Sequence, residues 1–370
     1  MLQLRENGYN VGFVAPRDIY TSLLEAEGFK FVPWYVNRQS LNPINEFKAL
    51  LNLWTIYHRE KPCLVHHFTI KACLYGTIAA KGARVYRVIN AITGLGHVFI
   101  GTRKRSVILR KIIMPLYKAA FTARRSIVIF QNASDQEKLI QLGIADDSRS
   151  RLIRGSGVDV NYFKPSPDKY LGHFRDPIQL LFPSRLIREK GIRELLAACK
   201  SLWSQGVNLE LLIAGELDRG NRSALSDDEI NHLQGNLRVR CLGHVDDMRS
   251  LYSSSDIVVL PSWREGLSRS LIEAAAMERP IITTDVPGCR DVVDHGLSGL
   301  LVPVRDARSI QLAIRLLLEN PSLARSLGKA ARLKVVSEFQ VMHVNQSTIS
   351  QYHQLLDMPL CRDNRFQPVS

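Results

Sequence analysis

Two basic side chains stand where an apolar run gives way to a stretch with helical periodicity. The run over 178–183 is typical of a strand, and Ser184-Arg185-Leu-Ile-Arg-Glu-Lys190-Gly191 follows it directly and opens an expected helix over 190–204. Arg185 and Lys190 would then both project over the carboxyl edge of a parallel sheet. Two fixed cations there can hold a diphosphate and neutralise the charge that builds on it as it leaves. An ordinary surface Arg and a snorkelling Lys remain the alternative.

A pair of carboxylates follows a second strand. Glu265 comes just after the apolar run over 256–260, and Glu273 lies eight residues on, about 12 Å further if the segment is helical. Gly266 would allow a tight turn, and the backbone N–H groups of the first helical turn would form an anion site. Because carboxylates repel a diphosphate, we expect Glu265 and Glu273 to accept hydrogen bonds from the hydroxyls of a sugar and a ribose. A capping Glu265 and a solvated Glu273 are the alternative.

A third strand ends in Gly215-Glu216, where a ligand could approach the backbone closely. The chain contains no Asp-x-Asp pair of the kind that carries Mg²⁺ or Mn²⁺, so we predict no metal and no cofactor besides the donor substrate. Lys190, Arg185 and Glu265 are the candidate catalytic residues. The candidate donor-binding residues are Ser184, Gly215, Glu216, Gly266, Leu267, Ser268 and Glu273.

In the first half, two loops carry polar side chains after expected strands. The candidate acceptor-binding residues are His66, His67, Thr69 and Lys71 in the first loop and Thr93, Gly94 and His97 in the second. Each histidine could equally be an ordinary polar loop residue.

A basic segment follows these loops, with apolar residues at helical spacing over 103–118. Its clustered cations suit a helix lying on anionic lipid, and a core helix with a basic outer face is the alternative. Pro115 would kink or interrupt it. The candidate membrane-facing residues are Arg103, Lys104, Arg105, Arg110 and Lys111.

The positive charge is concentrated in the first half. Residues 1–165 hold 24 Lys/Arg against 11 Asp/Glu, whereas residues 166–370 hold 25 against 24. Such asymmetry indicates an anionic partner, and nucleic acid, anionic lipid or a diphosphate-linked substrate all qualify on charge alone. We find no apolar run long enough to span a bilayer, no signal peptide, and six scattered cysteines that read as reduced thiols. These features predict a cytoplasmic protein, peripheral on the inner face of a membrane.

Apolar β-rich runs alternate with amphipathic stretches along the whole chain, as in βα units around parallel sheets. A Gly/Pro/Lys-rich segment over 155–170 separates two such series. We therefore predict an α/β fold of two doubly wound, Rossmann-like domains, over 1–165 and 166–339, facing across a cleft. Strands are expected near 10–15, 29–35, 62–65, 84–91, 126–130, 150–153, 178–183, 208–214, 237–242, 256–260, 280–284 and 298–302. Helices are expected near 43–60, 71–82, 103–122, 133–142, 190–204, 222–234, 246–253, 267–278 and 306–318.

The Arg185-x4-Lys190 spacing, the Glu265-x7-Glu273 motif and Pro287-Gly-Cys-Arg-Asp-Val-Val-Asp-His-Gly-x-Ser-Gly resemble the family-4 retaining glycosyltransferases of GT-B fold. The resemblance implies a nucleotide-sugar donor in the second domain, with Arg185 and Lys190 on the diphosphate, Glu265 on the donor sugar and Glu273 on the ribose. It also implies an acceptor-binding first domain, completed by a final helix over about 340–358.

The two acceptor loops resemble the branch of this family that extends undecaprenyl-diphosphate-linked glycans, the N-acetylgalactosaminyl and galactosyl transferases. A UDP-sugar donor, a lipid-linked saccharide acceptor, an anionic membrane surface and no nucleic acid are the partners so implied. Two departures stand out. Many members carry a His where this chain has Thr93, so a His-centred account of catalysis does not transfer. Members also begin with a central strand that this chain lacks, so we expect the true start to lie upstream of Met1.

Three functions remain open from the sequence. The first is the glycosyltransferase. The second is a nucleotide-sugar 2-epimerase on the same fold, which acts on free nucleotide sugar and needs no lipid-facing helix. The third is a basic lipid- or nucleic-acid-binding protein, which leaves Arg185, Lys190, Glu265 and Glu273 unexplained.

Overall fold

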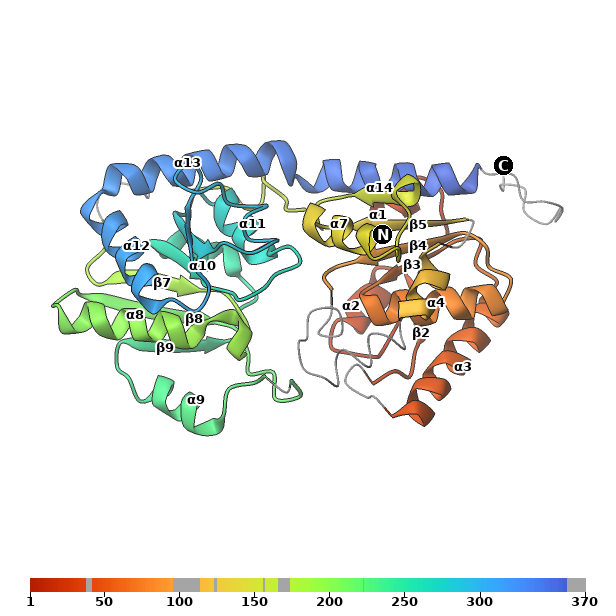
Figure 1. The fold of residues 1–370 in the computed structure, drawn as a ribbon, viewed down its shortest axis with the longest axis horizontal. Helices are drawn as coiled ribbons and strands as arrows, with labels where there is room; N and C mark the ends of the chain where they lie inside the picture. The colour runs from red at the N-terminus through yellow and green to blue at the C-terminus, as the bar shows by residue number, and fades with distance from the viewer. Residues whose placement is uncertain are drawn as a thin grey trace. The chain divides into compact units, whose positions relative to one another are not determined.

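The computed structural model describes residues 1–37, 42–95, 114–122, 125–155, 157–165, 174–221 and 223–357. The chain divides into two compact units (Figure 1). Unit 1 comprises Met1–Phe130, Gln136–Ile153 and Asn345–Ser370, and unit 2 comprises Gln131–Asp135 and Arg154–Val344. The boundary at Arg154 precedes the predicted residue 165, because Val158 forms a bridge with Gln340 and Phe163 packs in the core of unit 2.

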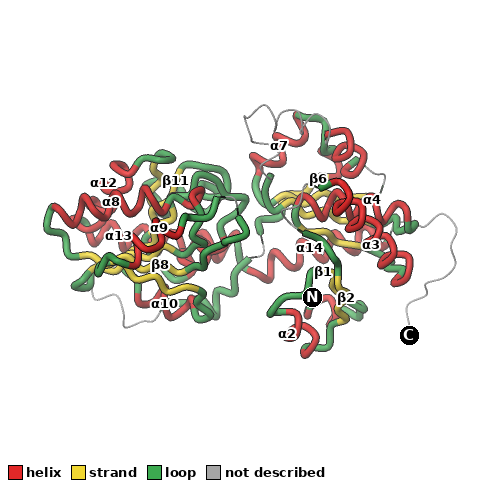
Figure 2. The backbone as a smooth tube through the Cα atoms, turned by 90° about the horizontal axis from the view of Figure 1, so that it is seen from below, coloured by secondary structure: helices red, strands yellow, loops and turns green. Residues whose placement is uncertain are grey.

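Unit 1 contains two parallel sheets, shown in yellow in Figure 2. One has the order β3-β4-β5-β6 and the other pairs β1 with β2. Its strands are β1 (Gly12–Ala15), β2 (Lys30–Pro33), β3 (Val65–Phe68), β4 (Val88–Ile92), β5 (Ser126–Phe130) and β6 (Ser150–Leu152). Its helices include α1 (Leu2–Glu6), α2 (Thr21–Ala26), α3 (Pro43–Glu60), α4 (Ile70–Gly82), α7 (Ala133–Gln141), which begins in unit 2, and most of α14 (Val341–Leu356). Residues 114–121 are helical as well. These pairings do not test the expected strand upstream of β1, which stays a prediction.

Local signals explain where these helices begin and end. The Asn42 side chain caps the start of α3 by accepting a hydrogen bond from the Ile44 amide, and Pro43 occupies the first turn. Both features are common at the start of a helix. The guanidinium of Arg87 donates to the carbonyls of Leu355 (2.8 Å) and Leu356 (3.0 Å). These bonds satisfy carbonyls that the end of α14 leaves unpaired, and they attach this helix to unit 1.

Unit 2 is one six-stranded parallel sheet with the order β12-β11-β10-β7-β8-β9. Its strands are β7 (Ile178–Phe182), β8 (Leu209–Ala214), β9 (Val239–Gly243), β10 (Ile257–Leu260), β11 (Ile281–Thr284) and β12 (Leu300–Val302). Its helices are α8 (Ile192–Ser204), α9 (Asp227–Gln234), α10 (Met248–Ser254), α11 (Arg269–Ala276), α12 (Ala307–Glu319) and α13 (Pro321–Glu338).

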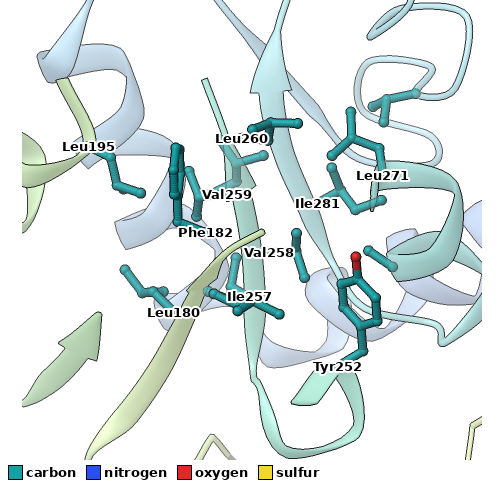
Figure 3. Packing of buried hydrophobic residues seen from close by; sticks show 14 of the residues in the cluster. Leu180, Phe182, Leu195, Tyr252, Ile257, Val258, Val259, Leu260, Leu271 and Ile281 are labelled. Atoms are coloured by element: carbon teal, nitrogen blue, oxygen red, sulfur yellow. The ribbon is translucent and has the colours of Figure 1, made fainter. Parts of the chain in front are cut away.

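The core of unit 2 lies on both faces of this sheet. All four residues of β10 are buried, and Leu180, Phe182 and Ile281 pack beside them on the neighbouring strands (Figure 3). A strand covered on both faces reads as a continuous apolar run, which is why the sequence located β10 and β11 within a residue. This packing fixes the strand ends from which the site loops start.

Several boundaries differ from the predicted ones. Strand β3 starts at Val65 rather than near 62, and α9 starts at Asp227 rather than near 222, because Ser226 and Glu229 form a capping box there. Helix α13 was not predicted. No helix in the described ranges is both long enough and apolar enough to cross a bilayer.

Candidate active site

The polar loops of unit 2 meet at the point where the order of strands in the sheet reverses. From β7 the chain builds β8 and β9 on one side, and it then crosses to β10 on the other side of β7. In doubly wound sheets, ligands bind outside the carboxyl ends of the strands at this switch point. Arg185 and Lys190 follow β7, and Glu265 follows β10, so the two motifs come from the two strands that flank the switch.

Three glycines hold these loops against one another. A Cβ on Gly191 (φ +78°) would lie 2.0 Å from the carbonyl oxygen of Pro261, and one on Gly215 would lie 2.0 Å from that of Ser184. A Cβ on Gly288 (φ +77°) would lie 2.5 Å from the carbonyl oxygen of Gly266. Since any larger residue would push the loops apart, glycine at these positions brings the candidate donor residues together.

Lys190 and Glu265 form an ion pair, with only 17% and 10% of their side chains exposed. The buried thiol of Cys289 lies beside them, and burial raises its pKa to about 12, with a smaller contribution from Glu265. The pair is therefore largely shielded from water, and burying the charge of either residue without its partner would be strongly unfavourable.

Arg185 is the more accessible cation of the site. Its guanidinium donates to the Asp218 carboxylate at 2.6 Å, and 58% of the Arg185 side chain is exposed. The Leu186 amide donates to the carbonyl of Glu216 (3.0 Å), so the loops after β7 and β8 are joined through their backbones as well. The Glu216 side chain itself is exposed.

The start of α11 corrects one sequence expectation. The helix begins at Arg269 with Ser268 at its N-cap, two residues later than predicted, so its first-turn amides do not belong to Gly266 and Leu267. The left-handed glycine at this junction is Gly288 rather than Gly266. The carbonyl of Gly266 accepts a hydrogen bond from Asn132 (2.8 Å), which fixes the turn.

Glu273 lies one turn into α11 with 10% of its side chain exposed. It accepts hydrogen bonds from Arg269 (2.8 Å) and from the hydroxyl of Tyr252 (3.3 Å), which is labelled in Figure 3. Burial raises the pKa of this carboxyl despite both partners. A cavity of about 520 Å³ opens beside Glu273, lined also by Tyr162, Asp246, Met248 and Arg269 among others.

In unit 1, the structure places His67 in the core. Its ring nitrogens bond to the Tyr57 hydroxyl (3.0 Å) and to Asn90 (2.8 Å), and only 5% of the residue is exposed. A Cβ on Gly76 would lie 2.3 Å from its ring. Burial lowers the pKa of His67 to about 4. A neutral, fully bonded histidine in the core has no group left for an acceptor, so we remove His67 from the acceptor set.

Of the other residues of the first acceptor loop, His66 is half-buried within β3, and Thr69 and Lys71 follow the strand. The Nδ1 atom of His66 bonds to the hydroxyl of Tyr352 at 2.6 Å, and its ring stacks on exposed Phe68. Thr69 is exposed and has φ +75° and ψ 150°, a conformation that is otherwise almost confined to glycine. Lys71 is engaged by the Glu46 carboxylate at 2.7 Å, so its charge is already paired.

Thr93 and Gly94 (φ +145°) follow β4, which pairs directly with β3. They therefore belong to the same sheet edge as Thr69. His97 and the predicted membrane-facing residues Arg103, Lys104, Arg105, Arg110 and Lys111 lie outside the described residues.

Two family models match the chain. The family model described as "Glycosyl transferases group 1" matches residues 165–334, and the one described as "Glycosyl transferase 4-like" matches residues 1–132. The chain is a glycosyltransferase, and its second half matches the group 1 model. It is 28% identical to the capsular polysaccharide biosynthesis glycosyltransferase CapM of Staphylococcus aureus, over 84% of this chain and 82% of the relative.

Two further relatives act on lipid-linked sugars by their names. One is the N,N'-diacetylbacillosaminyl-diphospho-undecaprenol alpha-1,3-N-acetylgalactosaminyltransferase of Campylobacter jejuni, 27% identical over 89% of this chain and 87% of the relative. The other is the UDP-Gal:alpha-D-GlcNAc-diphosphoundecaprenol alpha-1,3-galactosyltransferase of Escherichia coli, 26% identical over 84% and 80%.

Solved structures show the same fold. Anabaena HepE, in complex with UDP and glucose, matches with a TM-score of 0.73 at 20% identity over 91% of this chain and 89% of that chain. Sucrose-phosphate synthase from Thermosynechococcus elongatus matches with a TM-score of 0.77 at 23% identity over 96% and 91%. The glycosyltransferase therefore has the GT-B fold, and the predicted fold class, family and enzyme class are confirmed.

Sequence reasoning missed several residues of this glycosyltransferase that contact the predicted ones. Asp218 pairs with Arg185, Tyr252 bonds to Glu273, and Cys289 lies beside Lys190 and Glu265. Cys289 lies within the Pro287-Gly-Cys-Arg-Asp motif, but Asp218 and Tyr252 belong to no motif with a recognisable spacing. Tyr252 could have been suspected, since a buried tyrosine usually needs a partner for its hydroxyl.

Proposed function

We propose that this glycosyltransferase moves a hexose or N-acetylhexosamine from a UDP-sugar to a polyprenyl-diphosphate-linked saccharide, with retention of the anomeric configuration. The observation that carries the proposal is the shielded Lys190–Glu265 pair at the switch point, with Arg185 beside it. The named activities of the Campylobacter and Escherichia relatives support the lipid-linked acceptor and the UDP donor.

On the donor side, each charged residue has a role that its surroundings support. Arg185 is exposed and, among the residues that the structure describes, is paired through Asp218 alone, so it can turn to a diphosphate oxygen. Lys190 can contact the diphosphate while keeping Glu265, which leaves the carboxylate to accept a hydrogen bond from a donor-sugar hydroxyl. Glu273 borders the cavity of about 520 Å³, which suits a ribose and its base.

The transfer step would depend mainly on electrostatics. As the bond between the anomeric carbon and the diphosphate oxygen breaks, negative charge builds on the leaving group, and Lys190 and Arg185 stabilise it in a shielded place. The acceptor hydroxyl would attack from the same face and pass its proton to the departing phosphate. Thr69, Thr93 and Gly94 lie at one sheet edge of unit 1 and are the proposed acceptor-side residues, together with His66.

A transfer assay tests the proposal. The protein is incubated with radiolabelled UDP-sugars and a polyprenyl-diphosphate-linked saccharide, with and without a chelator. We expect labelled lipid-linked product in both conditions, and its loss in Lys190→Met but not in Lys200→Met, a lysine on α8 away from the site. Conversion of free UDP-sugar to its epimer without transfer would instead support the epimerase, and equal product from Lys190→Met would refute the donor assignment.

The site of action is part of the same proposal. A lipid-linked acceptor confines the reaction to a membrane surface, and the basic first half of the chain would be attracted to anionic lipid there. We therefore propose peripheral association with the inner face of a cell membrane, without nucleic acid as a partner.

A further inference from the structure

Helix α3 carries an apolar stripe on its outward face. Ile44, Phe47, Leu51 and Trp54 recur at intervals of three and four residues, and they are 65%, 61%, 45% and 39% exposed. The opposite face of the same helix is buried and consists of Ala49, Leu53, Ile56 and Tyr57. Core packing therefore explains one side of α3 and leaves four large apolar side chains on the other, which is unusual for a surface that contacts only water.

The charges of α3 are sorted between the same two sides. Of its two carboxylates, Glu46 is directed to Lys71 and Tyr75 on α4, and Glu60 pairs with Lys30 of β2 and with Arg59. The helical positions of Lys48 and Arg59 border the apolar stripe, and both residues are exposed. Within Pro43–Glu60 the outward face thus combines apolar and cationic side chains and has no carboxylate.

The stripe continues toward α4. The Trp54 ring stacks on His58 with centroids 5.5 Å apart, and a Cβ on Gly82 would lie 3.0 Å from it. On α4, Ile78 is 37% exposed and Lys81 is also exposed. A tryptophan at the rim of an apolar surface is typical of groups that lie between lipid headgroups and acyl chains.

We propose that the outward face of α3 docks on an anionic bilayer. Ile44, Phe47, Leu51 and Trp54 would enter the boundary between headgroups and acyl chains, while Lys48 and Arg59 contact lipid phosphates. A second copy of the chain fits less well, because a symmetric contact through this face would bring two identical basic surfaces together. This surface consists of other residues than the basic segment over 103–118. The inference rests on the proposed function in one respect, namely that the acceptor is lipid-linked.

Vesicle sedimentation with a matched pair of variants tests the docking surface. The test variant, Leu51→Ser/Trp54→Ser, removes two side chains of the stripe. The control variant, Leu312→Ser/Leu316→Ser, removes two comparably exposed leucines (51% and 41%) from α12 of unit 2. On phosphatidylcholine vesicles containing phosphatidylglycerol, we expect the first variant to partition on the order of tenfold more weakly than wild type. The α12 variant should bind as wild type does.

Charge is tested on the same vesicles with Lys48→Gln/Arg59→Gln. We expect about a fivefold loss per removed charge on anionic vesicles. The difference should vanish on pure phosphatidylcholine.

Calorimetric titration with UDP separates this inference from the proposed function. The Leu51→Ser/Trp54→Ser protein should bind UDP as wild type does, which shows that the donor site of unit 2 is intact. An unchanged circular dichroism spectrum would show that unit 1 is folded as well, so that only docking is lost. Unchanged vesicle binding of this variant would overturn the proposal. So would concentration-dependent dimerisation of wild type that the variant abolishes while vesicle binding is unaffected, because the stripe would then be a contact between copies.

Discussion

Replacing Gly191 by alanine should damage both the stability and the donor site of unit 2. Gly191 has φ +78°, and an added Cβ would meet the Pro261 carbonyl oxygen at 2.0 Å. The left-handed conformation alone costs a non-glycine residue about 1–2 kcal/mol. Moving the packed carbonyl adds about 1–3 kcal/mol, so we expect the free energy of unfolding to fall by about 2–5 kcal/mol.

Two other glycines separate these contributions. Gly206 has φ +82° with nothing within 4 Å of its Cβ position, so Gly206→Ala should lose only about 1–2 kcal/mol. Gly215 has no left-handed strain, but its Cβ would lie 2.0 Å from the Ser184 carbonyl oxygen, so Gly215→Ala should lose about 1–3 kcal/mol through the clash alone.

Urea denaturation measures the stability of each variant, and calorimetric titration with UDP measures the donor site. We expect Gly191→Ala and Gly215→Ala to weaken UDP binding by roughly tenfold or more, because both move a loop of the site. Gly206→Ala should bind UDP as wild type does. If Gly191→Ala and Gly206→Ala were equal in both measurements, the close approach of the loops would have no energetic consequence and the reasoning would fail.

Three further predictions concern single interactions. Lys190→Met should destabilise by about 3–5 kcal/mol, because Glu265 is left as an unpaired shielded charge, whereas Lys190→Met/Glu265→Gln should recover most of this loss in a urea titration. His67 has a pKa of about 4 when folded and about 6.5 when unfolded, so the unfolded state takes up the proton first as the pH falls. Lowering the pH from 7.5 to 5.5 should thus cost about 1.4 kcal/mol through this residue, and a His67→Gln protein should lack that part of the pH dependence. Thr69→Gly should relieve about 1–3 kcal/mol of backbone strain and raise the urea midpoint, and a lower midpoint would show that Thr69 is not strained.

The sequence could predict the donor motifs because each follows an apolar strand. The residue after a buried parallel strand lies at the carboxyl edge of the sheet, so Arg185, Lys190 and Glu265 were placed at one edge by local pattern alone. Their pairing could not be predicted in the same way. Lys190 meets Glu265 only because β10 lies beside β7, and strand order depends on the whole topology rather than on either segment.

His67 shows where local pattern held information that was not used. Side chains alternate across a strand, and in β3 the residues are buried, half-buried, buried and exposed from Val65 to Phe68. Two adjacent histidines on this strand cannot both face a ligand. The alternation of side chains would have predicted that one of the two histidines is buried in the core. It would not have predicted that Tyr57 and Asn90 are its hydrogen-bond partners.

The position of α11 shows a limit of sequence patterns. Glu265, Gly266 and Ser268 all suit a helix start, so its first residue could not be chosen from residue types. In the structure the helix begins at Arg269, and Asn132, which is distant in the sequence, donates a hydrogen bond to the Gly266 carbonyl just before it.

Calorimetric titration of UDP and of uridine, in the presence of a chelator, tests the central claim most directly. The comparison uses wild type and the charge-balanced Lys190→Met/Glu265→Gln protein, in which no unpaired charge is left buried. We predict that wild type binds UDP much more tightly than uridine without any divalent ion, and that the double variant binds UDP little better than uridine. Equal UDP affinity in the two proteins, or loss of wild-type UDP binding on chelation, would contradict a diphosphate held by these side chains.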